Sequence, residues 1–132
     1  MTGAPDGGRH VFEYALLRAV PRAERGECLN VGVLVHCRAR SAIVARTHLD
    51  EARVLAVDPR VDMASLRAAL SAVERVCEGG QAAGQAAGED PGRRFGWLVA
   101  PRSTVLRPGP VHTGLTVDPV AEAERLLDLL VR

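Results

Sequence analysis

The first fifty residues alternate between apolar and polar positions in the way that β-strands do. In residues 11–20 the large apolar side chains share one face of an extended chain. Residues 28–36 are almost continuously apolar and rich in valine, a pattern typical of a strand that is buried on both faces. Residues 42–47 predict a third strand. Because the links between these segments are short, we expect an antiparallel meander, since parallel neighbours would need a long crossover.

Further along the chain the apolar period changes to that of helices. Asp–Pro pairs at 58–59 and 118–119 predict two helix starts, because Asp caps the first amides and Pro fits the first helical position. The first of these helices is expected to end near residue 78, and the second to run to the end of the chain. Residues 49–57 indicate a shorter helix, and residues 94–100 return to a strand pattern.

This order of elements predicts one α+β domain, an antiparallel meander sheet with two to three helices packed on one face. The 132 residues suit a single domain, which we assign to residues 11–132. We expect residues 1–10 to be a disordered lead. Residues 79–92, which contain a small Gly-Gln-Ala-Ala repeat, should form a flexible loop of low complexity.

The charged residues exclude several chemistries. All 17 basic residues are arginines, so a Schiff-base lysine, a pyridoxal-phosphate anchor and a phosphate-loop lysine are excluded. The formal net charge of +1 makes duplex DNA an unexpected partner. Binding of a single RNA or DNA strand through Arg22, Arg25, Arg38 and Arg40 stays a weaker alternative, because stacking aromatics are scarce. No cofactor is expected.

Cys28, Cys37 and Cys77 are too far apart for a CxxC motif, and three cysteines without a signal peptide fit a reducing cytoplasm. A zinc site is not expected, because His36 and Cys37 would point to opposite faces of a strand. Cys28 is better explained as a small buried thiol than as a nucleophile. No apolar run reaches the length of a membrane span, so no membrane contact is expected.

The proline-framed run, residues 101–114, is the first candidate site. Three prolines exclude a helix there. Guanidinium, hydroxyl and imidazole groups concentrated in one extended segment favour recognition of a phosphate or carboxylate group. The alternative is an edge strand with polar outward residues, which prolines protect from pairing. The candidate ligand-binding residues of the run are Arg102, Ser103, Thr104, Arg107, His112 and Thr113.

A second candidate lies where a polar turn leads into the apolar strand of residues 28–36. Glu27 and Asn30, the only asparagine of the chain, could hydrogen-bond a ligand there. Bracing of the local turn is the more ordinary role for these residue types.

These residues support two hypotheses of function. The first is a non-catalytic ligand-binding or accessory module that recognises an anionic group, because arginines and hydroxyls occur together without an acid–base pair. The alternative is a small enzyme acting on a nucleotide or a phosphorylated metabolite, with His112 as acid or base and Cys28 or Glu27 assisting. No catalytic residue is assigned, and the alternative requires His112 to meet Glu27 and Asn30 in one cleft.

Four strings of the sequence, at residues 14–21, 25–33, 100–104 and 110–114, closely resemble the bacterial family DUF3037, whose members have no assigned function. The resemblance extends over nearly all the chain from residue 11 onward. Genes of this family often lie beside genes for a HipA-like kinase-fold protein, so the resemblance implies such a protein as a partner. It implies no catalytic residue and no ligand.

Overall fold

Three long strands in the first part of the chain form most of an antiparallel sheet, and two short strands from the second part complete its edge. The computed structural model describes residues 8–79 and 88–132. The sheet order is β3-β2-β1-β4, and β5 also pairs with β1, beyond the end of β4. Every pairing is antiparallel, as predicted. The strands are β1 (His10–Ala19), β2 (Leu29–Cys37), β3 (Ala42–Thr47), β4 (Leu106–Pro108) and β5 (His112–Thr116).

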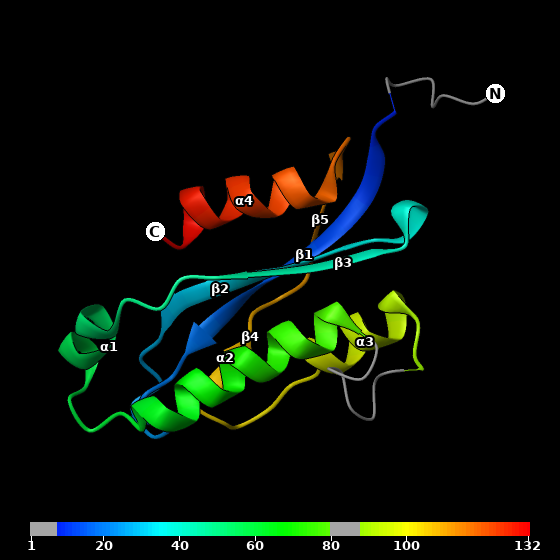
Figure 1. The fold of residues 1–132 in the computed structure, drawn as a ribbon. Coiled ribbons are helices and arrows are strands. Elements are labelled where there is room, and N and C mark those ends of the chain that lie inside the picture. Colours follow the sequence, from blue (N-terminus) through cyan, green and yellow to red (C-terminus); the bar gives the residue numbers. More distant parts are fainter. Residues whose placement is uncertain (1–7, 80–87) are drawn as a thin grey trace.

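Helices cover both faces of this sheet (Figure 1). The helices α2 and α3 lie on one face and α4 lies on the other, while α1 sits at one end of the sheet (Figure 1). The class, α+β with an antiparallel sheet, is therefore confirmed, but the described residues form four α-helices, and these are not all on one face. The helical elements are η1 (Arg38–Arg40), α1 (Glu51–Val57), α2 (Met63–Glu78), α3 (Pro91–Leu98) and α4 (Pro119–Leu130).

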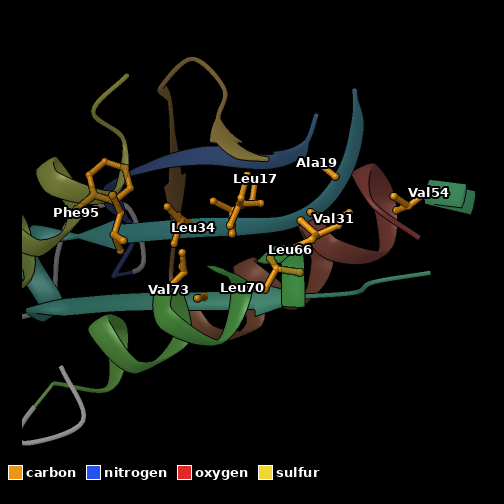
Figure 2. Close-up of a cluster of buried hydrophobic side chains, with 12 residues drawn as sticks. Leu17, Ala19, Val31, Leu34, Val54, Leu66, Leu70, Val73 and Phe95 are labelled. Carbon is orange, nitrogen blue, oxygen red and sulfur yellow. The ribbon is translucent and has the colours of Figure 1, made fainter. Parts of the chain in front are cut away.

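The apolar character of β2 explains why helices are needed on both faces. Val33 and Val35 belong to the buried cluster beneath α4, whereas Val31 and Leu34 belong to the cluster beneath α2 and α3. Figure 2 shows the second of these clusters, in which Leu66, Leu70 and Val73 of α2 meet side chains of the sheet. Because β2 carries apolar side chains on both faces of the sheet, both faces must be buried, and a single layer of helices could not cover them.

The start of α2 differs from the prediction. The N-terminal cap is Asp62, whose carboxylate accepts hydrogen bonds from Ser65, and not Asp58. Asp58 instead ends α1, and its buried carboxylate accepts a hydrogen bond from the backbone N–H of Arg60. That bond, together with the Arg22 guanidinium 2.7 Å away, lowers the pKa of Asp58. The Asp–Pro pair therefore lies in a turn between two helices here, and the Asp58 carboxylate is held by the Arg60 N–H and the Arg22 guanidinium instead of capping a helix.

The predicted strand at 94–100 is wrong: residues 94–98 belong to α3, and residues 99–100 form the turn that follows it. Asp90 caps this helix by accepting a hydrogen bond from the backbone N–H of Arg93 at 2.8 Å, and Pro91 occupies its first turn. Phe95 is buried but Trp97 is 46% exposed, so the apparent alternation did not reflect a strand face. The same Asp–Pro signal correctly predicted the start of α4, where Asp118 accepts hydrogen bonds from two backbone amides.

The predicted disordered lead and flexible loop fall partly outside the described residues. Residues 1–7 and 80–87 are not described, so the structure does not test either prediction there. At the edges of these ranges, His10 is already part of β1, and Pro91 and Gly92 are part of α3. None of the helices in the described ranges is long and apolar enough to cross a membrane.

Candidate functional site

The proline-framed run contains no helix, as predicted, and it contributes β4 and the first residues of β5, which share one edge of the sheet. Within residues 101–114, β4 pairs with the last residues of β1, and β5 pairs with its first half. Gly109, between the two strands, donates its backbone N–H to the Leu16 carbonyl at 2.8 Å. The edge-strand interpretation therefore describes the backbone of the run correctly. It does not exclude a ligand, because the segment just before β4 also forms the wall of a cavity.

A cavity of about 620 Å³, which we call the α2–β4 cavity, separates α2 from the segment that leads into β4. Its walls are mainly apolar, and polar side chains stand at its rim. Large apolar cavities with a few polar groups are the usual form of small-molecule sites in proteins. The lining residues are Leu17, Asp62, Ser65, Ala69, Ala72, Val73, Val76, Leu98, Arg102, Thr104, Val105, Leu106, Arg107 and Pro108.

Three of the predicted site residues line this cavity: Arg102, Thr104 and Arg107. Each also braces the backbone of its own segment. Arg102 donates to the carbonyls of Trp97 and Ala100, Thr104 Oγ1 donates to the Leu106 carbonyl at 2.7 Å, and Arg107 Nε donates to the Thr104 carbonyl at 3.0 Å. Within the described residues, Nη1 of Arg102 and both Nη atoms of Arg107 have no hydrogen-bond acceptor. These atoms can therefore donate to a bound anion without breaking a contact of the wall.

The other members of the run lie elsewhere. Ser103 is exposed and does not line the α2–β4 cavity. His112 lies on β5 opposite Tyr14, with the two ring centroids 5.1 Å apart. Thr113, the next residue, lies opposite Glu13 and so points to the other face of the sheet. The sequence thus predicted a single site of six residues, whereas the fold places these residues in at least two separate regions.

Glu27 and Asn30 do not join either group. Glu27 is exposed in the turn after β1, where an ion pair with Arg25 at 2.5 Å lowers its pKa. Asn30 donates from Nδ2 to the Leu130 carbonyl at 3.1 Å and so holds the last turn of α4 against the sheet. Asn30 therefore has a bracing contact, although with α4 and not with the turn before it.

The alternative catalytic constellation is not assembled. Tyr14, which faces His112, precedes the end of β1 at Ala19 by five residues, a separation of roughly 17 Å along a strand. Glu27 lies beyond that end. Cys28 is exposed, so its interpretation as a buried thiol is wrong: β2 begins one residue later, at Leu29, and leaves Cys28 in the turn.

A polar cleft that the sequence did not indicate lies at the first turn of α3, and we call it the β1–α3 cleft. It measures about 650 Å³ and contains a buried His36 whose Nδ1 is 3.1 Å from Glu13 Oε1. The ring of His36 also stacks on Phe95, with centroids 5.3 Å apart. The one available signal was a lone ionisable residue within an otherwise apolar strand. Its partner is 23 residues away in sequence, and only the register of β1 on β2 brings the two together.

Comparison with known proteins places the chain in a family. No curated protein and no solved structure matches the chain. The family model described as "Protein of unknown function (DUF3037)" matches residues 14–131, which include the larger part of β1, every later element to α4 and all the residues that line the α2–β4 cavity. The chain therefore belongs to the DUF3037 family.

Proposed function

We propose that the domain is a non-catalytic binding module whose α2–β4 cavity holds a ligand with an apolar body and one anionic group, a carboxylate or a phosphate. The observation that carries this proposal is the apolar cavity with two arginines at its rim, Arg102 and Arg107, whose Nη atoms have no acceptor in the described part of the chain. The anion would sit between these guanidinium groups. The apolar part would lie along the alanine and valine side chains of α2.

The two parts of the ligand contribute comparable amounts of binding free energy. A hydrogen bond to a charged group contributes about 1.5–3 kcal/mol. Burial of one CH₂ group contributes about 0.8 kcal/mol, so about two to four carbons in the cavity equal one arginine contact. An anion without an apolar body leaves the walls of the cavity empty, which is why we propose an amphipathic ligand and not a free inorganic ion.

Titration with alkyl carboxylates and alkyl phosphates of increasing chain length tests the proposal. The affinity should rise about fourfold per added CH₂ until the cavity is filled, because 0.8 kcal/mol corresponds to that factor. The only tryptophan, Trp97, gives a fluorescence signal for this titration, since its carbonyl accepts a hydrogen bond from Arg102. Ligand-dependent melting temperatures provide a second readout.

Variants separate the two parts of the cavity. Replacing either rim arginine by alanine should lower the affinity about 10- to 100-fold. Ala72→Phe should block the apolar part without removing a charge, because Ala72 lines the cavity from α2. Arg125→Ala is the matched control, since Arg125 lies on α4 and pairs with Glu122. If no compound of either series changes the fluorescence or the melting temperature, or if the rim variants bind as the parent does, the proposal is wrong.

For the accessory role, binding of a partner protein, we propose a separate surface on the paired strands β1 and β5. Val11 and Leu115 lie directly opposite each other on β1 and β5, yet they are 61% and 51% exposed. In the described part of the chain β5 pairs with β1 alone, and an exposed apolar pair beside such an edge suits a protein partner. We propose this surface for the HipA-like kinase-fold protein that the family resemblance implies. Co-purification of the two proteins should be lost in Leu115→Arg and kept in Leu129→Arg, a control on exposed α4. Equal effects of both variants would contradict the assignment.

A further inference from the structure

The β1–α3 cleft is lined by a buried ionisable side chain, His36. His36 is 9% exposed, and its only hydrogen-bond partner in the described ranges is Glu13, through Nδ1. The carboxylate accepts from Nδ1–H, so the neutral ring carries its lone pair on Nε2. Phe95 stacks on the ring and fixes its plane, so the direction of this lone pair is fixed as well.

Gly92 leaves the space in front of Nε2 open. A Cβ atom placed on Gly92 would lie 3.6 Å from His36 Nε2 and 3.7 Å from Cε1, in direct contact with this edge of the ring. Any longer side chain at position 92 would therefore cover the nitrogen. The ring is buried and held by two neighbours, and its remaining nitrogen faces a cavity. This nitrogen can accept a hydrogen bond, and the described residues supply no donor for it.

Two of the other lining residues are arginines, Arg38 and Arg93. No ion pair engages Arg38 among the described residues, and Arg93 makes only an exposed pair with Glu89, with Nη1 3.7 Å from Oε2. Pro91 has no N–H, and the N–H of Arg93 is taken by Asp90, which leaves the Gly92 N–H as the donor of the first turn of α3. The negative charges in the cleft are already engaged, Glu13 with His36 and Asp90 with the cap of α3.

We propose that the β1–α3 cleft is a second binding site, for inorganic phosphate in the form HPO₄²⁻, which keeps one P–OH near neutral pH; a phosphate monoester has lost this proton by then. Its P–OH donates to His36 Nε2, and its remaining oxygens accept from the guanidinium groups of Arg38 and Arg93. Sulfate has the same shape but no O–H at this pH, so it leaves Nε2 without a donor. Selection of phosphate over sulfate is the property that distinguishes this site from a general basic patch, and it does not depend on the α2–β4 cavity.

Titration of the whole protein with inorganic phosphate, phenyl phosphate and sulfate at about pH 8 tests the assignment. Two-dimensional ¹H–¹⁵N NMR of the imidazole rings gives the readout, with His36 assigned from the spectrum of His36→Gln. The Nδ1–H form of His36 should be present without ligand, and its Nε2 resonance should move on addition of inorganic phosphate, which is HPO₄²⁻ at this pH. Sulfate should bind at least tenfold more weakly than inorganic phosphate. Phenyl phosphate has lost its last proton at this pH and should bind as weakly as sulfate, so tight binding of phenyl phosphate would contradict the role of the P–OH group.

Three variants keep the proposal open to refutation. His36→Gln should lower the phosphate affinity at least tenfold and remove the preference over sulfate, whereas His48→Gln, the matched control outside the cleft, should change neither. Gly92→Leu should block phosphate without changing a charge. Arg102→Ala should leave phosphate binding intact, which separates this site from the α2–β4 cavity. Equal binding of phosphate and sulfate by the parent, binding unaffected by His36→Gln, or no binding at about 10 mM would overturn the proposal.

Discussion

Replacing Gly114 by alanine should destabilise the domain, because the new methyl group would overlap a buried aromatic ring. Gly114 on β5 lies opposite Phe12 on β1, and a Cβ atom there would lie 2.7 Å from Phe12 Cε1 and 3.0 Å from Cζ. Favourable carbon–carbon contacts are about 3.5–4.0 Å long. The ring is 4% exposed and belongs to the cluster beneath α4, so it cannot move aside without disturbing that cluster.

The expected cost is about 1–3 kcal/mol of unfolding free energy, the usual range for an overpacked core. For 132 residues the entropy of unfolding is about 0.28 kcal/mol per kelvin, at roughly 2.1 cal/mol/K per residue. The melting temperature should therefore fall by about 4–11 °C. Differential scanning calorimetry and urea unfolding monitored by circular dichroism measure both quantities.

Two controls test the cause of this loss. Gly96→Ala, inside α3 where a Cβ meets nothing within 4 Å, should stabilise the protein by about 0.5–1 kcal/mol. In a Phe12→Leu background, Gly114→Ala should cost clearly less than in the parent, because the overlapping ring atoms are gone. A melting temperature within 1 °C of the parent, or the same cost in both backgrounds, would show that the reasoning is wrong.

Three further predictions concern the backbone, the thiols and acid stability. Ser41→Gly should raise the unfolding free energy by about 0.5–1 kcal/mol in urea titrations, because Ser41 has a left-handed backbone with φ 47°. With iodoacetamide at pH 8, mass spectrometry should find Cys28 labelled first, since Cys37 is buried and burial raises the pKa of Cys77 to about 12. The pKa of Asp58 is lowered in the folded state, so its carboxylate stabilises the protein above the pKa that it has in the unfolded chain. This stabilisation is lost as the pH falls through the folded-state pKa. In urea unfolding, Asp58→Asn should therefore flatten the loss of stability between about pH 5 and pH 3.

Each of these has an outcome that contradicts it. Ser41→Ala keeps a Cβ in the left-handed region, so a gain equal to that of Ser41→Gly would show that backbone strain is not the cause. Labelling of Cys77 at the rate of Cys28 in the folded protein would contradict the raised pKa. If Asp58→Asn loses stability with the same pH dependence as the parent, the Asp58 carboxylate is not among the groups that determine acid stability.

Much of the local structure was predictable because it depends on short-range patterns. The three long strands follow from apolar alternation and valine content, and the Asp118–Pro119 start of α4 follows from capping chemistry within four residues. The same rules failed where two local signals competed. Phe95 and Trp97 alternate as in a strand, but the Asp90–Pro91 cap begins a helix that buries Phe95 and exposes Trp97.

The candidate sites were likewise predictable only where their residues are close in sequence. Arg102, Thr104 and Arg107 could be grouped from the sequence because they are within six residues of one another in an extended segment, and the structure places all three on one cavity. His112 was expected in the same group, but the turn between β4 and β5 carries it along β1 and away from that cavity. Residues that are close in sequence stay close in space only where the chain does not turn and where their side chains lie on the same face of the sheet.

What only the tertiary structure decided is which distant residues share a surface. The apolar run of β2 already required cover on both faces, yet nothing in the sequence of α4 says which face it takes. The pairing of Glu13 with His36 depends on the register of β1 on β2, in which a shift by one residue would turn every side chain to the other face. Local propensity determines the helices and strands, whereas register and packing follow from the burial of the whole apolar surface at once. Both candidate sites are lined by residues from separate elements, so only the tertiary structure could place them.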